Sequence, residues 1–409
     1  MPPAEAGADA RPDRRLATED SGDARPDRRA TGDARADVTS SEDAGRDATH
    51  DAPRDVLTTH DAPRDVMDAR VADAGQDAAP AVCTASTCTV VTMASKLYDP
   101  IAVAVDDTYL YWLEFGSPTY DGYGELVQIL KSAPCLKRSC YGVLDPMVLP
   151  QQTANSAAMG LGSGAVCYTQ SFDVPASHSV DCVPFVAGAQ EVDLDQSTGN
   201  VGDVWVGDAG AVWAVAGSSS TSTDGTIRTA TFTGAATTVV SGRAQPWAVA
   251  SDGQTIYWTE LGVAAGTGAV YASVGDGGAR PLATSQSTPQ AMALYDGYVY
   301  WANSGDGSVW RASTTSSTTS PESVATGLPV PVAVVVDGTG VYVACAGMGP
   351  SYLDGSVVQI AAPGATPITM LADENNLGGI AIDETYLYAA VAGSQGSAGV
   401  ILRIPKVVP

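Results

Sequence analysis

A seven-fold recurrence runs through most of this chain. An apolar residue followed by Tyr, Trp or Cys recurs ten residues after a turn-like position that is often Pro. The second member of this pair falls at Tyr111, Cys167, Trp213, Tyr257, Tyr300, Tyr342 and Tyr388. Successive spacings are 56, 46, 44, 43, 42 and 46 residues. Strand-like units repeated every 40 to 50 residues or so are typical of a β-propeller with one blade per repeat. We therefore predict an all-β, seven-bladed propeller.

Each repeat is expected to form a four-stranded antiparallel blade, because short β-branched or aromatic runs alternate with turn signals. The clearest repeat has strands predicted at 248–250, 255–259, 269–272 and 280–283. The last repeat lacks an outer strand before the chain stops. Thr89 to Met93 resembles the outer strands of other repeats, so we expect this N-terminal segment to pair beside the third strand of the last blade and close the ring.

Residues 1–82 differ sharply from the rest of the chain. They carry 11 Arg against 19 acidic residues, include near-copies of their own segments and contain no aromatic residue. Such a segment has too little apolar surface to offset its conformational entropy. We predict a disordered Ala/Asp/Arg-rich spacer over 1–82 and the propeller over 83–409. The alternatives are a tail without a specific role or an extension from a misplaced start codon.

Charge and cysteine content limit the possible partners and compartments. The formal charge of −25 argues against nucleic acid or an anionic membrane surface as partner. No apolar run is long enough to span a membrane, and the first residues lack the pattern of a secretory signal. Seven cysteines nevertheless favour an extracytoplasmic, secreted or cell-surface location. We expect a monomer.

The cysteine pairing is left open by the sequence, because six cysteines already allow 15 arrangements. Short spacing makes pairs Cys83 with Cys88 and Cys135 with Cys140 plausible. Cys167 and Cys182 fall on neighbouring strands of the second blade and could face one another. Cys345 would then be left over.

Three second strands carry a family resemblance. Leu110–Glu114 (LYWLE), Ile256–Glu260 (IYWTE) and Val299–Asn303 (VYWAN) resemble the Tyr-Trp-Thr-Asp repeat of low-density-lipoprotein-receptor-type propellers. They are also similar to repeats of uncharacterised secreted or lipoprotein-type bacterial propellers. The receptor propellers usually have six blades, whereas seven repeats are present here. The resemblance implies a protein-recognition or scaffold module rather than a catalyst.

A ladder of Asp residues precedes the first turn of several blades, at Asp106, Asp208, Asp252, Asp337 and Asp383. Carboxylates around a ring could gather calcium, which prefers oxygen ligands. The favoured interpretation is structural, because Asp at a strand end commonly caps its own turn.

A second column, three residues after the aromatic, varies between blades. It contains Glu114, Gln170, Ala216, Glu260, Asn303, Cys345 and Val391. Variation among equivalent positions is where a specific site would be built, so we predict Glu114, Gln170, Glu260 and Asn303 as ligand-binding residues at the channel mouth. The alternative is that they are solvated rim residues. The following loops, including Phe115 to Tyr123 and Ala346 to Leu353, form the expected contact surface.

Catalysis is poorly supported by the residues available. His50 and His60 fall in the spacer and only His178 belongs to the predicted propeller, so histidine-dependent acid–base or metal chemistry lacks its groups. We predict a non-catalytic binding or scaffold propeller that recognises a protein or surface ligand. The alternative is a lactonase-like, calcium-dependent hydrolase, which needs no histidine base and could use Glu114, Glu260 and Asn303. No cofactor is expected apart from this possible calcium ion.

Overall fold

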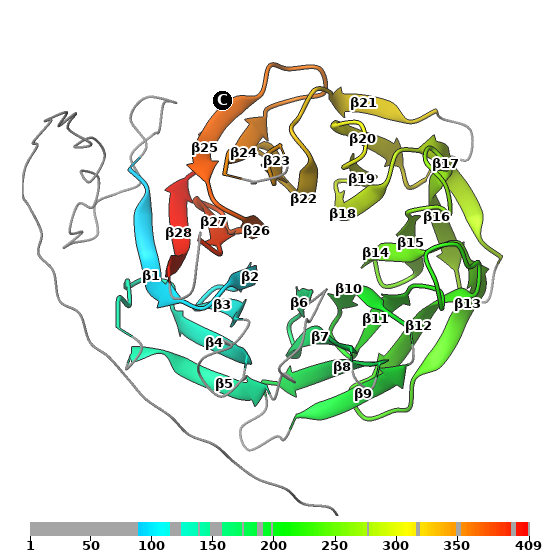
Figure 1. Cartoon of the computed structure of the whole chain (residues 1–409), viewed down its shortest axis with the longest axis horizontal. Coiled ribbons are helices and arrows are strands. Elements are labelled where there is room, and N and C mark those ends of the chain that lie inside the picture. The colour runs from blue at the N-terminus through cyan, green and yellow to red at the C-terminus, as the bar shows by residue number, and fades with distance from the viewer. Residues whose placement is uncertain are drawn as a thin grey trace, which may run out of the picture. The chain divides into compact units, whose positions relative to one another are not determined.

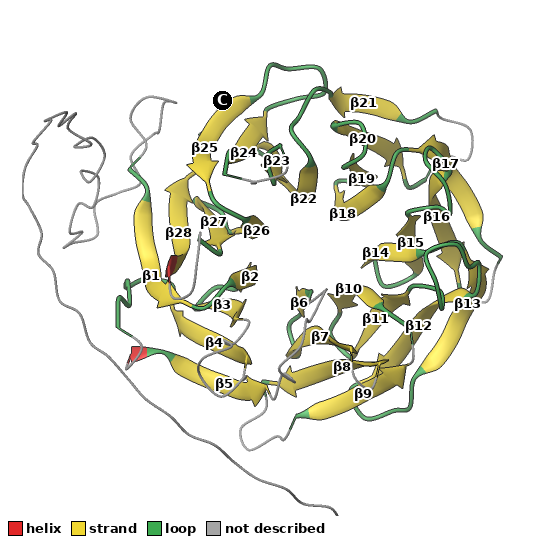
Figure 2. Ribbon diagram, in the orientation of Figure 1, coloured by secondary structure: helices red, strands yellow, loops and turns green. Residues whose placement is uncertain are grey.

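Seven four-stranded antiparallel sheets are arranged as blades around a common axis in a computed structural model (Figures 1 and 2). The structure describes residues 89–114, 124–137, 140–147, 158–173, 176–185, 191–197, 199–275, 278–315, 320–348, 353–393 and 398–407. The predicted fold class is confirmed. The predicted spacer over 1–82 lies outside the described residues, so its disorder and the domain boundary at 82/83 stay predictions.

The strands follow one another from the axis outwards in each blade. Blades 1 and 2 consist of β2 (Pro100–Val105), β3 (Tyr109–Glu114), β4 (Gly124–Leu130) and β5 (Gly142–Met147), then β6 (Met159–Leu161), β7 (Ala165–Asp173), β8 (Ala176–Pro184) and β9 (Val192–Ser197). Blades 3 and 4 consist of β10 (Val201–Val206), β11 (Gly210–Val215), β12 (Gly225–Thr231) and β13 (Thr237–Arg243), then β14 (Pro246–Ser251), β15 (Thr255–Glu260), β16 (Gly268–Val274) and β17 (Arg280–Gln286).

The remaining blades repeat this order. Blades 5 and 6 consist of β18 (Pro289–Tyr295), β19 (Tyr298–Asn303), β20 (Ser308–Ser313) and β21 (Glu322–Ala325), then β22 (Pro331–Asp337), β23 (Gly340–Cys345), β24 (Gly355–Ile360) and β25 (Ile368–Glu374). Blade 7 consists of β26 (Leu377–Ile382), β27 (Tyr386–Val391), β28 (Gly399–Pro405) and, as its outer strand, β1 (Val91–Leu97).

In six of the seven blades, all except blade 2, the innermost strand is offset by a bulge close to its start. In blade 4, Pro246 pairs with Glu260, whereas Val249 pairs with Trp258 after a one-residue shift. A Pro at the first position suits this pattern, because Pro cannot donate to a regular ladder. Large side chains of the aromatic column, such as Trp213, Tyr257, Tyr342 and Tyr388, are fully buried. The aromatic column therefore belongs to the core.

Blade 3 departs by one residue from the alignment that the sequence suggests. Val201, not Gly202, occupies the position of Pro246, since it pairs with the last residue of the second strand, Val215. Trp213 consequently matches Trp258 rather than Tyr257. Gly202 also packs closely against the next blade. A Cβ at this position would lie 2.4 Å from the carbonyl oxygen of Trp247, so the packing requires Gly here. The member of the second column in this blade is therefore Val215, the last residue of β11, and not the predicted Ala216.

The ring is closed by the N-terminal strand, as predicted. β1 pairs antiparallel with β28, with Val91 opposite Arg403 and Leu97 opposite Gly399. The neighbouring blade reinforces this closure through the connection between β4 and β5. In that connection the Cys135 N–H donates to the Met93 carbonyl at 2.7 Å. Closure therefore involves both a strand ladder and contacts with blade 1.

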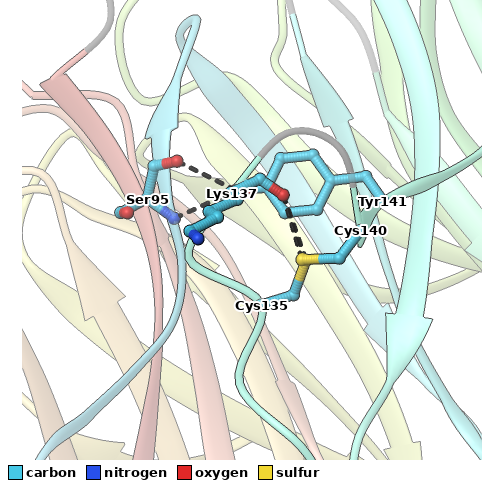
Figure 3. The surroundings of a disulfide bond; sticks show 5 residues. All are labelled: Ser95, Cys135, Lys137, Cys140 and Tyr141. Atoms are coloured by element: carbon cyan, nitrogen blue, oxygen red, sulfur yellow. Dashed lines mark hydrogen bonds between the residues drawn. A yellow bond between two sulfur atoms is a disulfide. The ribbon is translucent and has the colours of Figure 1, made fainter.

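A disulfide stabilises this reinforcing connection. Cys135 and Cys140 are bonded, and the adjacent Tyr141 hydroxyl donates to the Ser95 carbonyl of β1 at 2.9 Å (Figure 3). The Ser95 N–H donates back to the same hydroxyl at 3.3 Å. The disulfide thus fixes a short loop whose next residue contacts the closing strand.

The other cysteine predictions are met where they can be followed. Cys167 and Cys182 lie opposite each other on β7 and β8 and form a disulfide. Cys345 is a buried free thiol, and burial raises its pKa to about 12, which disfavours the reactive thiolate. The pair Cys83 and Cys88 lies outside the described residues. None of the described helices is long and apolar enough to cross a membrane.

Candidate functional site

The two faces of the ring differ in their connections. We call the face with the turns between first and second strands the hairpin face, and the face with the connections between second and third strands the loop face. The turns between first and second strands are two or three residues long in every blade, whereas the loop-face connections between second and third strands range from two to nine residues. The hairpin face also carries the connections between third and fourth strands, which range from five to eleven residues. The blades therefore differ in connection length on both faces, and on the loop face they differ directly after the second strands.

The Asp ladder organises the turns of the hairpin face. In blade 7, Asp383 accepts hydrogen bonds from the N–H groups of Thr385 at 2.9 Å and Tyr386 at 2.7 Å, and from the hydroxyl of Tyr388 at 3.0 Å. The corresponding bonds form in blades 1 and 4 around Asp106 and Asp252. The favoured interpretation, turn capping, is confirmed at these positions.

The pKa of these carboxylates reflects the capping bonds. For Asp383, burial alone would raise the pKa, but the N–H groups of Tyr386 and Thr385, the Tyr388 hydroxyl and Lys131 together lower it below its ordinary value. The pKa of Asp252 is lowered in the same way by Thr255 and Gln254. The ionised form is therefore the one that these turns stabilise.

Asp208 does not belong to the ladder. The residue equivalent to Asp106 in blade 3 is Gly207, whose N–H donates to the Gly210 carbonyl across the turn. Asp208 instead accepts a hydrogen bond from the Ser163 hydroxyl of blade 2 at 2.6 Å. The one-residue shift of blade 3 explains this correction.

Two predicted ligand-binding residues, Glu114 and Glu260, are buried within their blades. They are only 1% and 4% exposed. Glu114 accepts from the indole N–H of Trp112 at 3.0 Å and from the Tyr98 N–H at 3.2 Å. Glu260 accepts from the indole of Trp258 at 3.1 Å. Each glutamate lies two residues after its Trp on one strand face, so the Trp-x-Glu spacing is the sequence signal for this contact.

Glu260 also belongs to a cluster of charged and aromatic side chains. Arg243 donates through Nε to Glu260 Oε1 at 2.5 Å, and its guanidinium lies 4.2 Å from the centroid of the Tyr271 ring and 5.6 Å from that of Trp258. The Ala244 N–H completes the shell of the carboxylate at 3.3 Å. The arrangement satisfies the buried charge.

The remaining predicted residues are Asn303 and Gln170. Asn303 is 1% exposed and donates to Gln286 Oε1 at 3.0 Å and Ser308 Oγ at 3.1 Å. Gln286 also accepts from the Trp301 indole at 2.8 Å. It is therefore the acceptor of the indole N–H in this blade, as glutamate is in blades 1 and 4. Gln170 pairs with Ser179 in the β7–β8 ladder.

The structure does not bring these four residues together on one site. They belong to β3, β7, β15 and β19 of four different sheets, and Glu114, Glu260 and Asn303 do not line the central cavity. Within the described part of the chain, no group of three or more His, Cys, Asp and Glu is placed to hold a metal ion. A ligand-binding role for Glu114, Gln170, Glu260 and Asn303 stays a prediction.

A cavity of about 500 Å³ lies on the ring axis, lined by residues of all seven innermost strands. Most of its lining is aliphatic, with Trp247 as an aromatic member. Ala346, which follows β23, also lines it, so the cavity reaches the loop face. Among the described lining residues, Asp203 is the one with a charged side chain.

Asp203 is a candidate functional residue that sequence reasoning missed. With the shifted register of blade 3, its equivalents in the other six blades are Ala102, Ala158, Ala248, Ala291, Ala333 and Gly379. The fold therefore needs no side chain larger than that of Ala at this position. The sequence signal is an Asp where the other blades have Ala or Gly. It is visible only when blade 3 is shifted by one residue from the alignment that the aromatic column suggests.

Burial and backbone bonds determine the state of this carboxylate. Burial raises the pKa of Asp203 to about 6, although the N–H groups of Val204 and Val249 hydrogen-bond to it and act in the opposite direction. The Val204 N–H lies 2.9 Å from Oδ1. No described Lys, Arg or His forms an ion pair with Asp203.

Comparison with known proteins shows similarity of fold and identifies no family. No protein-family model matches the chain, and no curated protein matches its sequence. Among solved structures, the hydrazine synthase of Kuenenia stuttgartiensis matches with a TM-score of 0.52 at 11% identity, covering 76% of this chain and 97% of that chain. YCF48, solved bound to D1 peptide, matches with a TM-score of 0.50 at 10% identity, covering 80% and 99%.

A propeller from the nidogen/laminin complex also matches, with a TM-score of 0.46 at 14% identity over 63% of this chain and 95% of that chain. At such identities the likeness concerns the fold alone. The Tyr-Trp-Thr-Asp-type and bacterial lipoprotein-type resemblances therefore stay predictions.

Proposed function

We propose that this protein is a non-catalytic, monomeric binding or scaffold propeller that acts outside the cytoplasm and recognises a protein or surface ligand through its loop face. The observation that carries the proposal is that the loop-face connections between second and third strands differ in length between blades, from two to nine residues, at the face that the axial cavity reaches. Binding surfaces are commonly built from variable loops on a rigid scaffold. The two disulfides support an extracytoplasmic location.

Exposed apolar side chains offer contact points on the loop face. Met348 and Leu353, in the connection after β23, are 62% and 52% exposed, and Val263 after β15 is exposed as well. The hairpin face also has exposed apolar residues, at Leu130, Leu136, Phe185, Val274 and Tyr295. Met348 and Leu353 differ from these in lying together on one nine-residue connection, and exposed apolar residues grouped on a loop are suited to a protein partner. No observation favours the hydrolase alternative, since the described carboxylates form no shared cation site.

Selection of peptides from a displayed library on the full chain tests the face that is used. We expect selected peptides to lose at least tenfold in affinity when Met348 and Leu353 are both changed to Ser, because these side chains are the exposed contacts. The matched control changes Leu130 and Val274, which end third strands on the hairpin face and are also exposed, to Ser. Peptides that depend on the control pair instead would contradict the proposal.

The hydrolase alternative has a direct test of its own. We expect no lactone hydrolysis by the purified chain with or without millimolar calcium. Calcium-dependent turnover that disappears when Glu114 or Glu260 is changed to Gln would establish that alternative in place of the binding module.

A further inference from the structure

The central cavity holds a carboxylate that the fold does not need. Five of the six equivalent positions carry Ala and the sixth carries Gly, so Asp203 is an addition specific to blade 3. A partly buried carboxylate in an apolar wall, without a paired charge, lowers the stability of the folded state unless a ligand supplies that charge. An acid at this place is therefore expected to have a function.

The carboxylate is held in one orientation by the backbone. Its Oδ1 accepts from the Val204 N–H at 2.9 Å, and the Val249 N–H of the neighbouring blade also hydrogen-bonds to it. A carboxylate has further acceptor sites beyond these two bonds. Water still reaches part of the residue, so a group entering the cavity can reach it as well.

The walls around Asp203 favour a ligand with an apolar body. Trp247, from the next blade, lines the same cavity together with Met159 and Met292. A volume of about 500 Å³ is within the usual range for a small-molecule site, roughly 300 to 1,000 Å³. Aromatic faces attract organic cations, and the overall charge of −25 adds a long-range attraction for positive ligands.

We propose that the axial cavity is a binding site for a small organic amine, with its ammonium group on the carboxylate of Asp203 and its apolar body among Trp247, Met159 and Met292. This site goes beyond the proposed function, because it lies on the ring axis and does not require the exposed loop residues. The two proposals can succeed or fail independently.

Few other ionisable groups lie on the strands around Asp203. The strands β6, β11 and β14, which pack beside β10, contain no Asp, Glu, His, Lys or Arg. The ionisable residues of β7 and β8, apart from the disulfide cysteines, are Tyr168, Asp173, His178 and Asp181. Of these, Tyr168 donates its hydroxyl to Glu191, and Asp181 accepts from Ser179. His178 can also titrate between pH 5 and 7.5, so a pH effect on amine binding in this range is assigned to Asp203 only when it disappears in Asp203→Asn.

The test is isothermal titration calorimetry of the full chain with 2-phenylethylamine and with 2-phenylethanol, an uncharged analogue of the same size. We expect the amine to bind at pH 7.5 and to lose about tenfold in affinity at pH 5, one unit below the pKa of Asp203. The alcohol should bind with one weak affinity at both pH values.

Two variants locate the site. Asp203→Asn keeps an oxygen for the backbone N–H groups and should lose at least tenfold in amine affinity at pH 7.5, with no remaining pH dependence. Asp208→Asn, which removes a charge from the hairpin turn of the same blade, should bind the amine as the unchanged chain does. Asp203→Ala, the residue of five other blades, provides a second variant if the Asn variant does not fold.

Three outcomes would overturn the proposal. The unchanged chain could show no amine binding at millimolar concentration, the amine could bind Asp203→Asn undiminished, or the alcohol could lose affinity with the variant as strongly as the amine does. Loss of peptide binding in the Met348 and Leu353 variant with amine binding intact would show that the two sites are independent. Peptides that depend on Leu130 and Val274 instead, with amine binding intact, would overturn the proposed function and leave the axial site standing.

Discussion

Asp383 and Asp203 are both associated with innermost strands, but at opposite ends of the strand and in opposite circumstances. Asp383 lies just after β26 on the hairpin face, where N–H groups and a tyrosine hydroxyl lower its pKa. Asp203 lies near the start of β10 on the channel wall, where burial raises its pKa. The same side chain thus stabilises the fold at one end of the strand and is tolerated at the other.

The contrast shows how a repeat protein separates folding from function. At the hairpin face, a shared residue does the same work in several blades, and its loss is a loss of stability. At the channel wall, one blade departs from a position that is otherwise Ala or Gly. Departures from the repeat that reduce stability are the positions where a function is to be sought.

The largest expected effect concerns Glu260, which lies beneath the loop face. Its substitution tests whether this buried charge stabilises the blade or binds a ligand. Glu260→Ala removes the partner of Arg243 and of the Trp258 indole inside the blade. We expect a loss of about 3 to 5 kcal/mol in the free energy of unfolding, because a buried charge is left unpaired. Urea unfolding followed by circular dichroism measures it.

The control for this variant is Glu322→Ala, which breaks the ion pair with Arg311 where the glutamate side chain is 53% exposed. Its cost should be under about 1 kcal/mol. Equal losses in the two variants would show that Glu260 is not structurally essential and would revive its predicted role in ligand binding.

An increase in stability is expected from Asp203→Asn. Its raised pKa means that the folded state prefers the protonated acid, so the destabilising contribution of Asp203 is absent below the ordinary Asp pKa of about 4 and is fully present once the pH has risen above about 6. The variant should therefore be more stable by about 2 kcal/mol at pH 7, with no gain at pH 4. Melting temperatures across this pH range provide the measurement. A variant that is less stable at pH 7 would contradict an unpaired buried charge.

The smallest effect is expected for the turn cap. Asp383→Ala removes the acceptor of two N–H groups and of the Tyr388 hydroxyl and should cost about 1 to 2 kcal/mol at pH 7. Because the pKa of Asp383 is lowered, this contribution is present above pH 4 and is lost as the pH falls through the folded-state pKa. Melting temperatures at pH 7 and pH 3 measure it, and Asp208→Ala, outside the ladder, should cost less than about 0.5 kcal/mol.

The fold was predictable because its signals are local and repeated. The aromatic column, the Asp turns and the outer-strand pattern before Pro100 each depend on residues close in sequence, and the structure confirms the blades and the closing strand. Blade 3 was misaligned because Trp213 satisfies the motif while occupying the position of Trp258. A one-residue shift is hard to see when the first strand lacks its usual Pro.

The candidate site was less predictable for a physical reason. Whether Glu114 reaches a ligand or its own Trp112 depends on side-chain direction, which the strand period shows only when the Trp-x-Glu pair is considered together. Identifying Asp203 as a candidate required the position of the bulge in β10, because its equivalence to the Ala positions is visible only when the register is known.

The pairing of β1 with β28 also determines when the protein can become complete. β1 must wait for β28 to be synthesised, so the ring cannot close until residues 399–405 have left the ribosome. Until then, the third strand of the final blade has no outer neighbour and β1 has no partner. Exposed strand edges invite pairing with other chains, so the interval before closure is when a nascent propeller of this kind is most dependent on molecular chaperones.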